Sequence, residues 1–205
     1  MGRTKGYDRD VVAEQAMHAF WSVGYASTTA RQLADATGVN VSTLYAEFGN
    51  KEGLYLAAIG FYEREMVTRY IGALEQPDAS IATVRQVLLQ YPEFARADDG
   101  APGCLLCNAA IEQAPTPEAS RASTARYVER ITAGITNALA HEREKGSTAT
   151  DGELAAFGHY LAAVLLGLFV MVRARVKVDI LEDAVKQAIA DLDALVLNGS
   201  ASRPT

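Results

Sequence analysis

The chain has 205 residues, 49% of them hydrophobic, and carries 19 Lys and Arg against 25 Asp and Glu, for a net charge of −6. This length allows one small domain and one larger one, each with a buried core. The first five residues lead into charged positions without the apolar stretch of a signal peptide. The longest apolar run, residues 161–172, is interrupted by Gly167 and is too short to span a bilayer. We therefore expect a cytoplasmic protein with no membrane partner.

Residues 28–55 predict two short helices separated by a tight turn at Gly38, followed by a third helix that begins at Asn50-Lys51. Thr28 is a suitable helix cap, and Gly38 supplies the positive φ that a sharp turn between helices needs. Asn40 is the next cap, and the helix that it opens is expected over residues 41–47. Two helices joined in this way form a helix-turn-helix, which places its second helix in the major groove of DNA.

This segment resembles the DNA-binding domain of the TetR-type transcriptional repressors over about the first quarter of the chain. The positions that match the family pattern are Thr28-Thr29, Leu33-Ala34, Ala36-Thr37-Gly38-Val39, Leu44-Tyr45, Phe48, Lys51-Glu52 and Leu54, preceded by Val12, Ala16, Phe20 and Gly24 in a first helix. The resemblance implies an all-α fold. Its parts would be a three-helix DNA-binding domain (1–52), a six-helix effector-binding and dimerisation domain (53–197) and a disordered tail (198–205).

The expected partner is a palindromic double-stranded DNA operator, bound by a homodimer. The candidates for reading bases are Arg31, Asn40, Val41, Ser42 and Thr43. The candidates for phosphate contacts, by their match to the family motif or their place at a helix N-terminus, are Thr28, Thr29, Tyr45 and Lys51. Glu47 is ranked low as a DNA contact, because its carboxylate repels phosphate.

The distribution of charge is compatible with this interpretation, although the chain as a whole is acidic. Residues 1–55 carry five Lys and Arg against six Asp and Glu, a balance of −1, which leaves 14 against 19, or −5, for the other 150 residues. Most of the excess acid therefore lies outside the DNA-binding segment. A helix-turn-helix that serves structure alone remains the alternative.

The rest of the chain predicts helices throughout and no strand, for nine helices in all. After the helix-turn-helix, the expected helices cover residues 51–74, 80–97, 104–114, 118–145, 151–175 and 180–197. The last two carry apolar faces wider than one neighbour needs, which predicts a four-helix bundle with a second subunit. The candidate interface residues are Ala155, His159, Leu166, Val185, Ile189 and Leu192. Internal core packing is the alternative.

In the TetR-type family, the helices between these two regions enclose a pocket for a small effector. The candidates here are Phe61, Tyr62, Met66, Tyr91, Phe94, Cys104, Cys107, Tyr127, Phe169 and Arg173, the last as a buried partner for an anion. The aromatic members also suit a packed core. The sequence names neither the effector nor the operator, and it leaves repression or activation open, with repression favoured.

Chemical motifs are scarce. The three histidines (His18, His141 and His159) lie in separate predicted helices, and no nucleophile elbow, phosphate loop or metal-ligand pattern occurs, so we expect no enzyme, no cofactor and no metal. Cys104 and Cys107 form a C-x-x-C pair after Pro102-Gly103. The favoured interpretation is inert packing. The alternatives are a redox- or electrophile-sensing regulator and a small thiol oxidoreductase, which would normally need a βαβ context.

Overall fold

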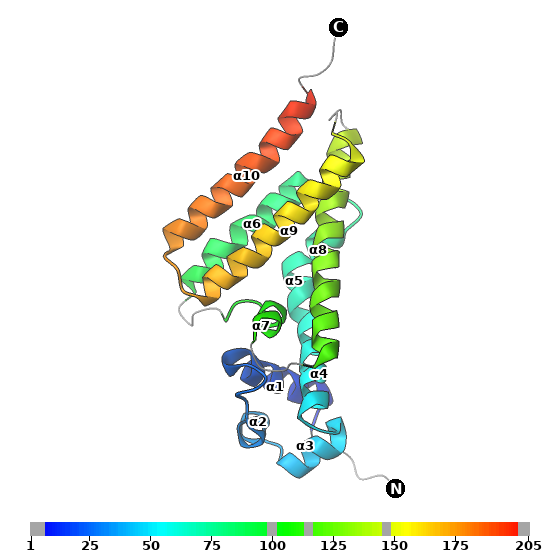
Figure 1. Ribbon diagram of the computed structural model, residues 1–205. Coiled ribbons are helices and arrows are strands. Elements are labelled where there is room, and N and C mark those ends of the chain that lie inside the picture. Colours follow the sequence, from blue (N-terminus) through cyan, green and yellow to red (C-terminus); the bar gives the residue numbers. More distant parts are fainter. Residues whose placement is uncertain (1–6, 98–101, 113–116, 145–148, 201–205) are drawn as a thin grey trace. The chain divides into compact units, whose positions relative to one another are not determined.

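Every regular element of the structure is helical within the residues that it describes. Figure 1 presents the computed structural model, which describes residues 7–97, 102–112, 117–144 and 149–200, without the side chains of 142–144 and 196–200. Taking the continuous run from Lys51 to Glu75 as one helix, these residues form nine helices and no strand. The predicted all-α fold is confirmed.

The chain forms two compact units. The first comprises Met1–Thr68 and Leu105–Ala125, and the second comprises Arg69–Cys104 and Arg126–Thr205. The domain boundary expected after residue 52 falls inside helix α4 (Lys51–Tyr62). The difference arises because α4 packs along α1 (Arg9–Val23), which keeps it with the DNA-binding segment.

The first unit is built on that packing of α1 against α4. We call α1 to α4, residues 9–62, the head; it also contains α2 (Ala30–Thr37) and α3 (Val41–Phe48). Val12, Ala16 and Phe20 of α1 are buried, and the Phe20 and Tyr55 rings meet edge to face with their centroids 4.8 Å apart. Short α7 (Leu105–Ile111) lies against α4 at the end of the unit away from α2 and α3 (Figure 1).

Two glycines fix the sharp turns of the head. Gly38 ends α2 in the left-handed conformation, with φ of 65°, as the sequence predicts. Gly53 lies where the first turn of α4 approaches the preceding helix. A Cβ atom on Gly53 would stand 1.8 Å from the carbonyl oxygen of Phe48, so no other residue fits without moving α3 relative to α4.

A π-helical segment interrupts the long helix that was expected over residues 51–74. α4 continues into the π-helix η1 (Glu63–Val67), then α5 (Thr68–Ile71) and the 3-10 helix η2 (Gly72–Glu75). The Thr68 hydroxyl donates a hydrogen bond of 3.4 Å to the carbonyl of Glu63, five residues earlier. Such π segments occur often at functional sites.

The second unit contains a layer of three long helices that lie side by side (Figure 1). They are α6 (Ile81–Arg96), α9 (Asp151–Arg173) and α10 (Val178–Ser200), and we call them the layer. Most of α8 (Glu118–Glu144) belongs to this unit as well. There α8 passes close to η2, since a Cβ on Gly134 would lie 2.8 Å from the Cβ of Leu74.

The ends of several helices differ from the expected bounds. α9 stops at Arg173 because the chain turns through Arg175, whose φ is 52°. α10 runs to Ser200, so residues 198–200, expected in a disordered tail, are helical. Residues 113–116, 145 and 201–205, which were assigned to helix ends, a loop and the tail, lie outside the described residues.

α9 also bears on the expectation that no segment reaches across a membrane. In the described part of the chain it is the one helix long and apolar enough to do so by length and composition. One face of α9, including Leu161, Leu165 and Phe169, is buried within the protein. A core helix of a soluble protein passes the same test of length and composition, so a single helix of this kind does not by itself indicate a membrane span.

Candidate nucleic-acid interface

α2 begins one residue later than the sequence suggested. Thr29 is the N-cap: its hydroxyl accepts from the Gln32 amide at 3.2 Å, and the Gln32 side chain accepts from the Thr29 amide at 2.8 Å. This reciprocal pair is a capping box. Thr28 is instead buried, and its hydroxyl donates to the carbonyl of Gly24 at 2.6 Å. Thr28 therefore holds the loop before α2, and we remove it from the candidate DNA contacts.

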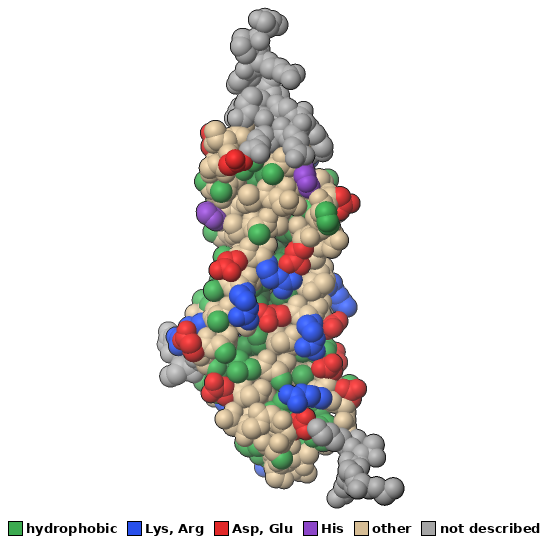
Figure 2. All heavy atoms as spheres, turned by 90° about the vertical axis from the view of Figure 1, so that its right-hand side faces the viewer, with side chains coloured by type: hydrophobic (Ala, Val, Ile, Leu, Met, Phe, Trp, Pro, Cys, Tyr) green, Lys and Arg blue, Asp and Glu red, His purple; other side chains and the backbone are tan. Residues whose placement is uncertain are grey.

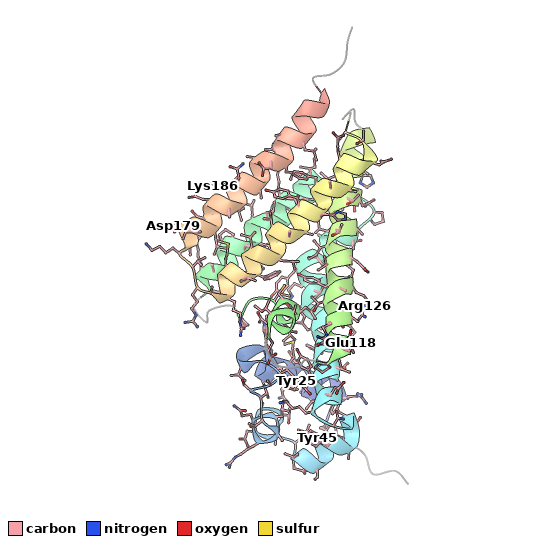
Figure 3. The ribbon with its side chains drawn as sticks, viewed as in Figure 1. Tyr25, Tyr45, Glu118, Arg126, Asp179 and Lys186 are labelled. Carbon is pink, nitrogen blue, oxygen red and sulfur yellow. The ribbon has the colours of Figure 1, made fainter. Side chains whose placement is uncertain are left out.

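α3, the candidate recognition helix, is capped by Asn40 as predicted. The Asn40 carboxamide oxygen accepts from the Thr43 amide at 2.9 Å and from the Ser42 hydroxyl at 2.6 Å. Asn40 and Ser42 are exposed, whereas Val41 and Thr43 are half-buried. The outward face at the start of α3 is therefore small and polar, and Tyr45, half-buried and labelled in Figure 3, follows it along the helix.

Arg31 is the most exposed cation of the head for which an ion pair is seen. Its side chain is 91% exposed and lies 3.9 Å from the carboxylate of Asp35, one turn along α2. An ion pair so open to solvent contributes little. The guanidinium can therefore exchange Asp35 for the edge of a base or a phosphate at small cost.

Glu47 is engaged within the head. Its side chain is only 10% exposed, and its carboxylate accepts from Arg9 at 2.9 Å and from the Tyr7 hydroxyl at 3.2 Å. The Arg9 guanidinium also lies over the Phe48 ring, 4.8 Å from its centroid. These contacts balance the negative charge that α3 would otherwise bring to phosphate, and they connect the segment before α1 to the recognition helix.

Lys51, a predicted phosphate contact, makes two contacts inside the protein. Its ammonium donates to the carbonyl of Ala26 at 3.3 Å and lies 4.7 Å from the centroid of the Tyr25 ring. Burial lowers the pKa of Lys51, and the negative charge of Glu112 opposes that shift. The ammonium thus braces the loop between α1 and α2, whether or not it also reaches phosphate.

Glu112 is a residue of this region that the sequence did not reveal. Its carboxylate accepts from the backbone amides of Tyr25 at 3.1 Å and Ala26 at 2.8 Å. Glu112 lies directly after α7, more than eighty residues from the loop that it holds. No spacing rule in the sequence connects an acid at this distance to two backbone amides.

The effector candidates fall into two groups, one in each unit. Phe61, Tyr62, Met66 and Cys107 belong to the first unit, and Tyr91, Phe94, Cys104, Tyr127, Phe169 and Arg173 to the second. In the second unit the ring centroids of Tyr91 and Phe169 are 4.8 Å apart, and those of Phe94 and Tyr70 are 5.0 Å apart. Tyr70 was not among the candidates, although its place on the expected helix was clear.

We call Tyr70, Tyr91, Phe94 and Phe169 the aromatic cluster. Burial raises the pKa of the Tyr70 phenol, and Cys104 adds a smaller effect of the same sign. The expectation that Arg173 is a buried partner for an anion requires correction. Arg173 is exposed and donates to the carbonyl of Pro102 at 3.0 Å, because it is the last residue of α9 and projects past the packed part of the helix.

Cys104 and Cys107 are not joined by a disulfide, and both side chains are buried. Cys104 is fully enclosed and Cys107 is 7% exposed. A reactive thiol usually needs access to solvent and a cationic neighbour. The burial favours the interpretation that these side chains pack.

The interface candidates differ in whether they are free to meet a second subunit. Val185 and Leu192 are buried by helices of the same chain, Ala155, Leu166 and Ile189 are half-buried, and His159 is exposed. Beside His159, an exposed and mostly apolar stripe runs along α9. We call it the α9 stripe; it consists of Ala156, Tyr160, Ala163, Gly167 and Val170.

Charged side chains of both signs are mixed over much of the surface. On the face shown in Figure 2, Lys and Arg lie among Asp and Glu rather than in a patch of one sign. Arg64 with Asp10 at 3.1 Å is one such exposed pair. Among the residues whose placement is described, no group of three or more His, Cys, Asp or Glu is arranged to hold a metal ion.

Comparison with known proteins agrees with this geometry. Residues 13–58 match the model of the family described as bacterial regulatory proteins, tetR family. Over 199 residues the chain is 28% identical to YezE of Bacillus subtilis (strain 168), an uncharacterized HTH-type transcriptional regulator. The aligned region covers 94% of this chain and 100% of that protein. The chain is a TetR-type transcriptional regulator.

Three further proteins that are similar to this TetR-type regulator are informative. It is 33% identical over 108 residues to the HTH-type transcriptional repressor ComR of Escherichia coli (strain K12), a match that spans 52% of this chain and about half (51%) of ComR. The solved structure of the TetR family regulator CifR, a cysteine mutant complexed with 26-bp double-strand operator DNA, superimposes with a TM-score of 0.79 at 26% identity, covering 92% of this chain and 98% of CifR. A TetR regulator of Chloroflexus aurantiacus J-10-FL has the same fold, with a TM-score of 0.77 at 22% identity and coverage of 90% and 93%.

Proposed function

We propose that the protein is a repressor that binds a palindromic operator as a homodimer and leaves it when a small molecule binds. The observation that carries the DNA-binding part is the outward face of α2 and α3. There Arg31 on α2 offers a guanidinium that is 91% exposed, and α3 offers a polar start with exposed Asn40 and Ser42. The similar CifR structure is bound to operator DNA, and ComR is named a repressor, which supports the same roles here.

The proposed division of labour assigns base reading to Arg31, Asn40, Val41, Ser42 and Thr43, with Thr29, Tyr45 and Lys51 on phosphates. A bidentate Arg-to-guanine contact discriminates bases, whereas a phosphate contact weakens all sequences alike when it is lost. Val41 and Thr43, which are half-buried, would then act through the apolar contacts that a thymine methyl offers.

Selection of DNA from a random library, followed by affinity measurements at fixed salt, tests this proposal. We expect the wild type to select a palindrome. Arg31→Ala should weaken binding to this palindrome by about tenfold and relax the base preference at one position in each half-site. Lys51→Ala should instead lower the affinity for every DNA sequence equally. Arg69→Ala, which removes the same charge from α5, is the control. Equal losses over all sequences in both Arg31→Ala and Lys51→Ala would contradict the division of roles.

The homodimer part of the proposal places the α9 stripe, with His159, at the subunit interface. Its members recur every three or four residues, so they lie on one side of α9. Tyr160 is 40% exposed and Val170 is 42% exposed, which is unusual for side chains of this size in a run of apolar neighbours. A second copy of the stripe would cover it in a symmetric contact.

The effector part of the proposal centres on the aromatic cluster of the second unit. A compound found by its effect on thermal unfolding should also release the operator, because a ligand shifts the population toward the state that it prefers. Phe94→Ala should lose this response. Phe157→Ala, which removes a ring from another part of α9, should keep it. Binding without release in the wild type would contradict the mechanism.

A thiol-based response through Cys104 and Cys107 is not our proposal, because both side chains are buried. The solved CifR structures carry cysteine substitutions, and that property belongs to those proteins. Operator release by peroxide that Cys104→Ser abolishes would reverse this preference.

A further inference from the structure

The loop from Gly24 to Thr29 determines where α2 begins. Gly24 ends α1, and its carbonyl accepts from the amide of Thr28 at 3.3 Å and from the Thr28 hydroxyl at 2.6 Å. The next residue, Thr29, is the N-cap of α2. Because the loop is short and leads directly into that cap, a shift of the loop moves Arg31 and the rest of α2.

Two side chains from other elements hold the centre of this loop. Lys51, the first residue of α4, donates to the carbonyl of Ala26 at 3.3 Å. Glu112, which follows α7, accepts from the amides of Tyr25 and Ala26. Ala26 is therefore bound on both sides: Lys51 of α4 binds its carbonyl, and Glu112 after α7 binds its amide.

The carboxylate of Glu112 is closely fitted to the loop. A Cβ atom on Gly24 would stand 3.0 Å from the nearer carboxylate oxygen, and Gly24 has a φ of +88° that favours glycine. The absence of a side chain at Gly24 thus lets the carboxylate reach both amides. Hydrogen bonds from backbone amides to an ionised acceptor are stronger than those between neutral groups.

We infer that Glu112 is a positioning residue of the DNA-binding surface: it ties α7 to the start of α2, so that operator affinity depends on where α7 lies. This inference rests on the proposed function and names a residue through which the operator response would act. α7 begins at Leu105, where the chain passes from the second unit to the first, and it also packs on α4. A change in the second unit that pulls on this connection would reach Arg31 through the loop.

The test compares Glu112→Gln with Glu118→Gln, both as full-length protein with the selected operator. Glutamine offers one acceptor oxygen in place of two, so one of the two loop amides loses its partner. We expect Glu112→Gln to weaken operator binding by about tenfold. Glu118, labelled in Figure 3, pairs with Arg121 on the surface of α8, and Glu118→Gln should stay within about twofold of wild type.

Amide hydrogen exchange separates positioning from general destabilisation. In Glu112→Gln, the amides of Tyr25 and Ala26 should exchange faster than in wild type, while those in the middle of α1 should not change. A double-mutant cycle with Lys51→Met adds a second measure. Both side chains hold Ala26, so the double variant should lose less affinity than the product of the two single losses.

The outcomes are distinct. Equal operator affinities of Glu112→Gln and Glu118→Gln, with a wild type that binds, would overturn the inference and leave the proposed function intact. A wild type that selects no operator would overturn the proposed function and, with it, the positioning role. Unchanged exchange at Tyr25 and Ala26 in Glu112→Gln would show that the contact does not hold the loop, which also overturns the inference.

Discussion

The head and the layer hold their shape by different means. In the head, α2 and α3 have eight residues each, and every start is fixed by a side-chain cap: Thr29 for α2, Asn40 for α3 and Asn50 for α4. Helices this short are marginal on their own, so caps and turns decide whether they form. In the layer, α9 and α10 have 23 residues each and rely on long apolar faces.

This difference has a consequence for mutation. In the head, single positions carry particular geometric tasks, so the effect of a substitution depends sharply on its place. In the layer, the stabilising free energy is spread over many buried side chains, and most single changes there should act through volume alone. The predictions below address the exceptions to this contrast.

The largest effect is expected at the α9 stripe, the exposed apolar surface of the layer that we propose as the subunit interface. Ala163→Glu places a carboxylate in the middle of the α9 stripe, where dimerisation would bury it without a partner. An unpaired charge in an interface costs roughly 3–5 kcal/mol, so the dimer dissociation constant should rise by at least about a hundredfold. Sedimentation velocity over a range of concentrations measures this.

The matched control for the interface is Ala133→Glu, an exposed alanine on α8 that receives the same charge. We expect it to remain a dimer with the dissociation constant of wild type. If Ala163→Glu also dimerises with the dissociation constant of wild type, the α9 stripe is not the interface.

The next effect concerns the head. Gly53→Ala would bring a Cβ within 1.8 Å of the Phe48 carbonyl oxygen and should destabilise the protein by about 3 kcal/mol. Gly60→Ala, about two helix turns further along α4, meets only the end of Arg64 at 3.8 Å. Because alanine is the better helix former, Gly60→Ala should stabilise by about 0.5–1 kcal/mol. Urea unfolding at constant pH measures both variants, and similar results for the two would contradict the close contact of α3 with α4.

The contrast between the regions also explains how much of the structure could be predicted. The fold of the head followed from the spacing of its motif, since a tight turn needs Gly38 and a helix start needs Asn40. The prediction was wrong at the start of α2, where it placed the cap at Thr28, one residue before the observed N-cap. Both threonines are good caps, and the choice of Thr29 depends on Gln32 three residues later, which completes the capping box.

Other features depend on contacts that no local pattern carries. The hold of Glu112 on Tyr25 and Ala26 joins segments distant in sequence. Across the π-helix η1 the successive buried residues are Tyr62 and Val67, five positions apart, so a search for helical spacing of three and four does not reveal it. Val185 and Leu192 belong to an apolar stripe that the sequence cannot divide between a core face and an interface face, and both are buried in the core.

The smallest effect tests whether a single charged contact in the second unit contributes to the stability of the fold, as single contacts do in the head. Arg130 on α8 donates from two nitrogens to the Glu75 carboxylate, at 2.6 Å and 2.9 Å. This hydrogen bonding lowers the pKa of Glu75 below its ordinary value of 4.5, against a smaller opposing effect of burial. Both side chains are about one-third exposed, so solvent screening limits the contribution of the pair to roughly 0.5–1 kcal/mol.

The sign of the pH dependence follows from that lowered pKa. A carboxyl whose pKa is lower in the folded protein than in the unfolded chain stabilises the fold above its unfolded value, and this stabilisation is lost as the pH falls through the folded value. Glu75→Gln should therefore lower the free energy of unfolding at pH 7, and its difference from wild type should shrink as the pH falls below 4.5. Glu129→Gln, an exposed neighbour of Arg130, should show no such difference at either pH. Urea unfolding at both pH values measures the effect. A loss in Glu75→Gln that stays constant with pH would assign the contribution of Glu75 to packing instead of charge, and the pair would then resemble the rest of the second unit rather than the head.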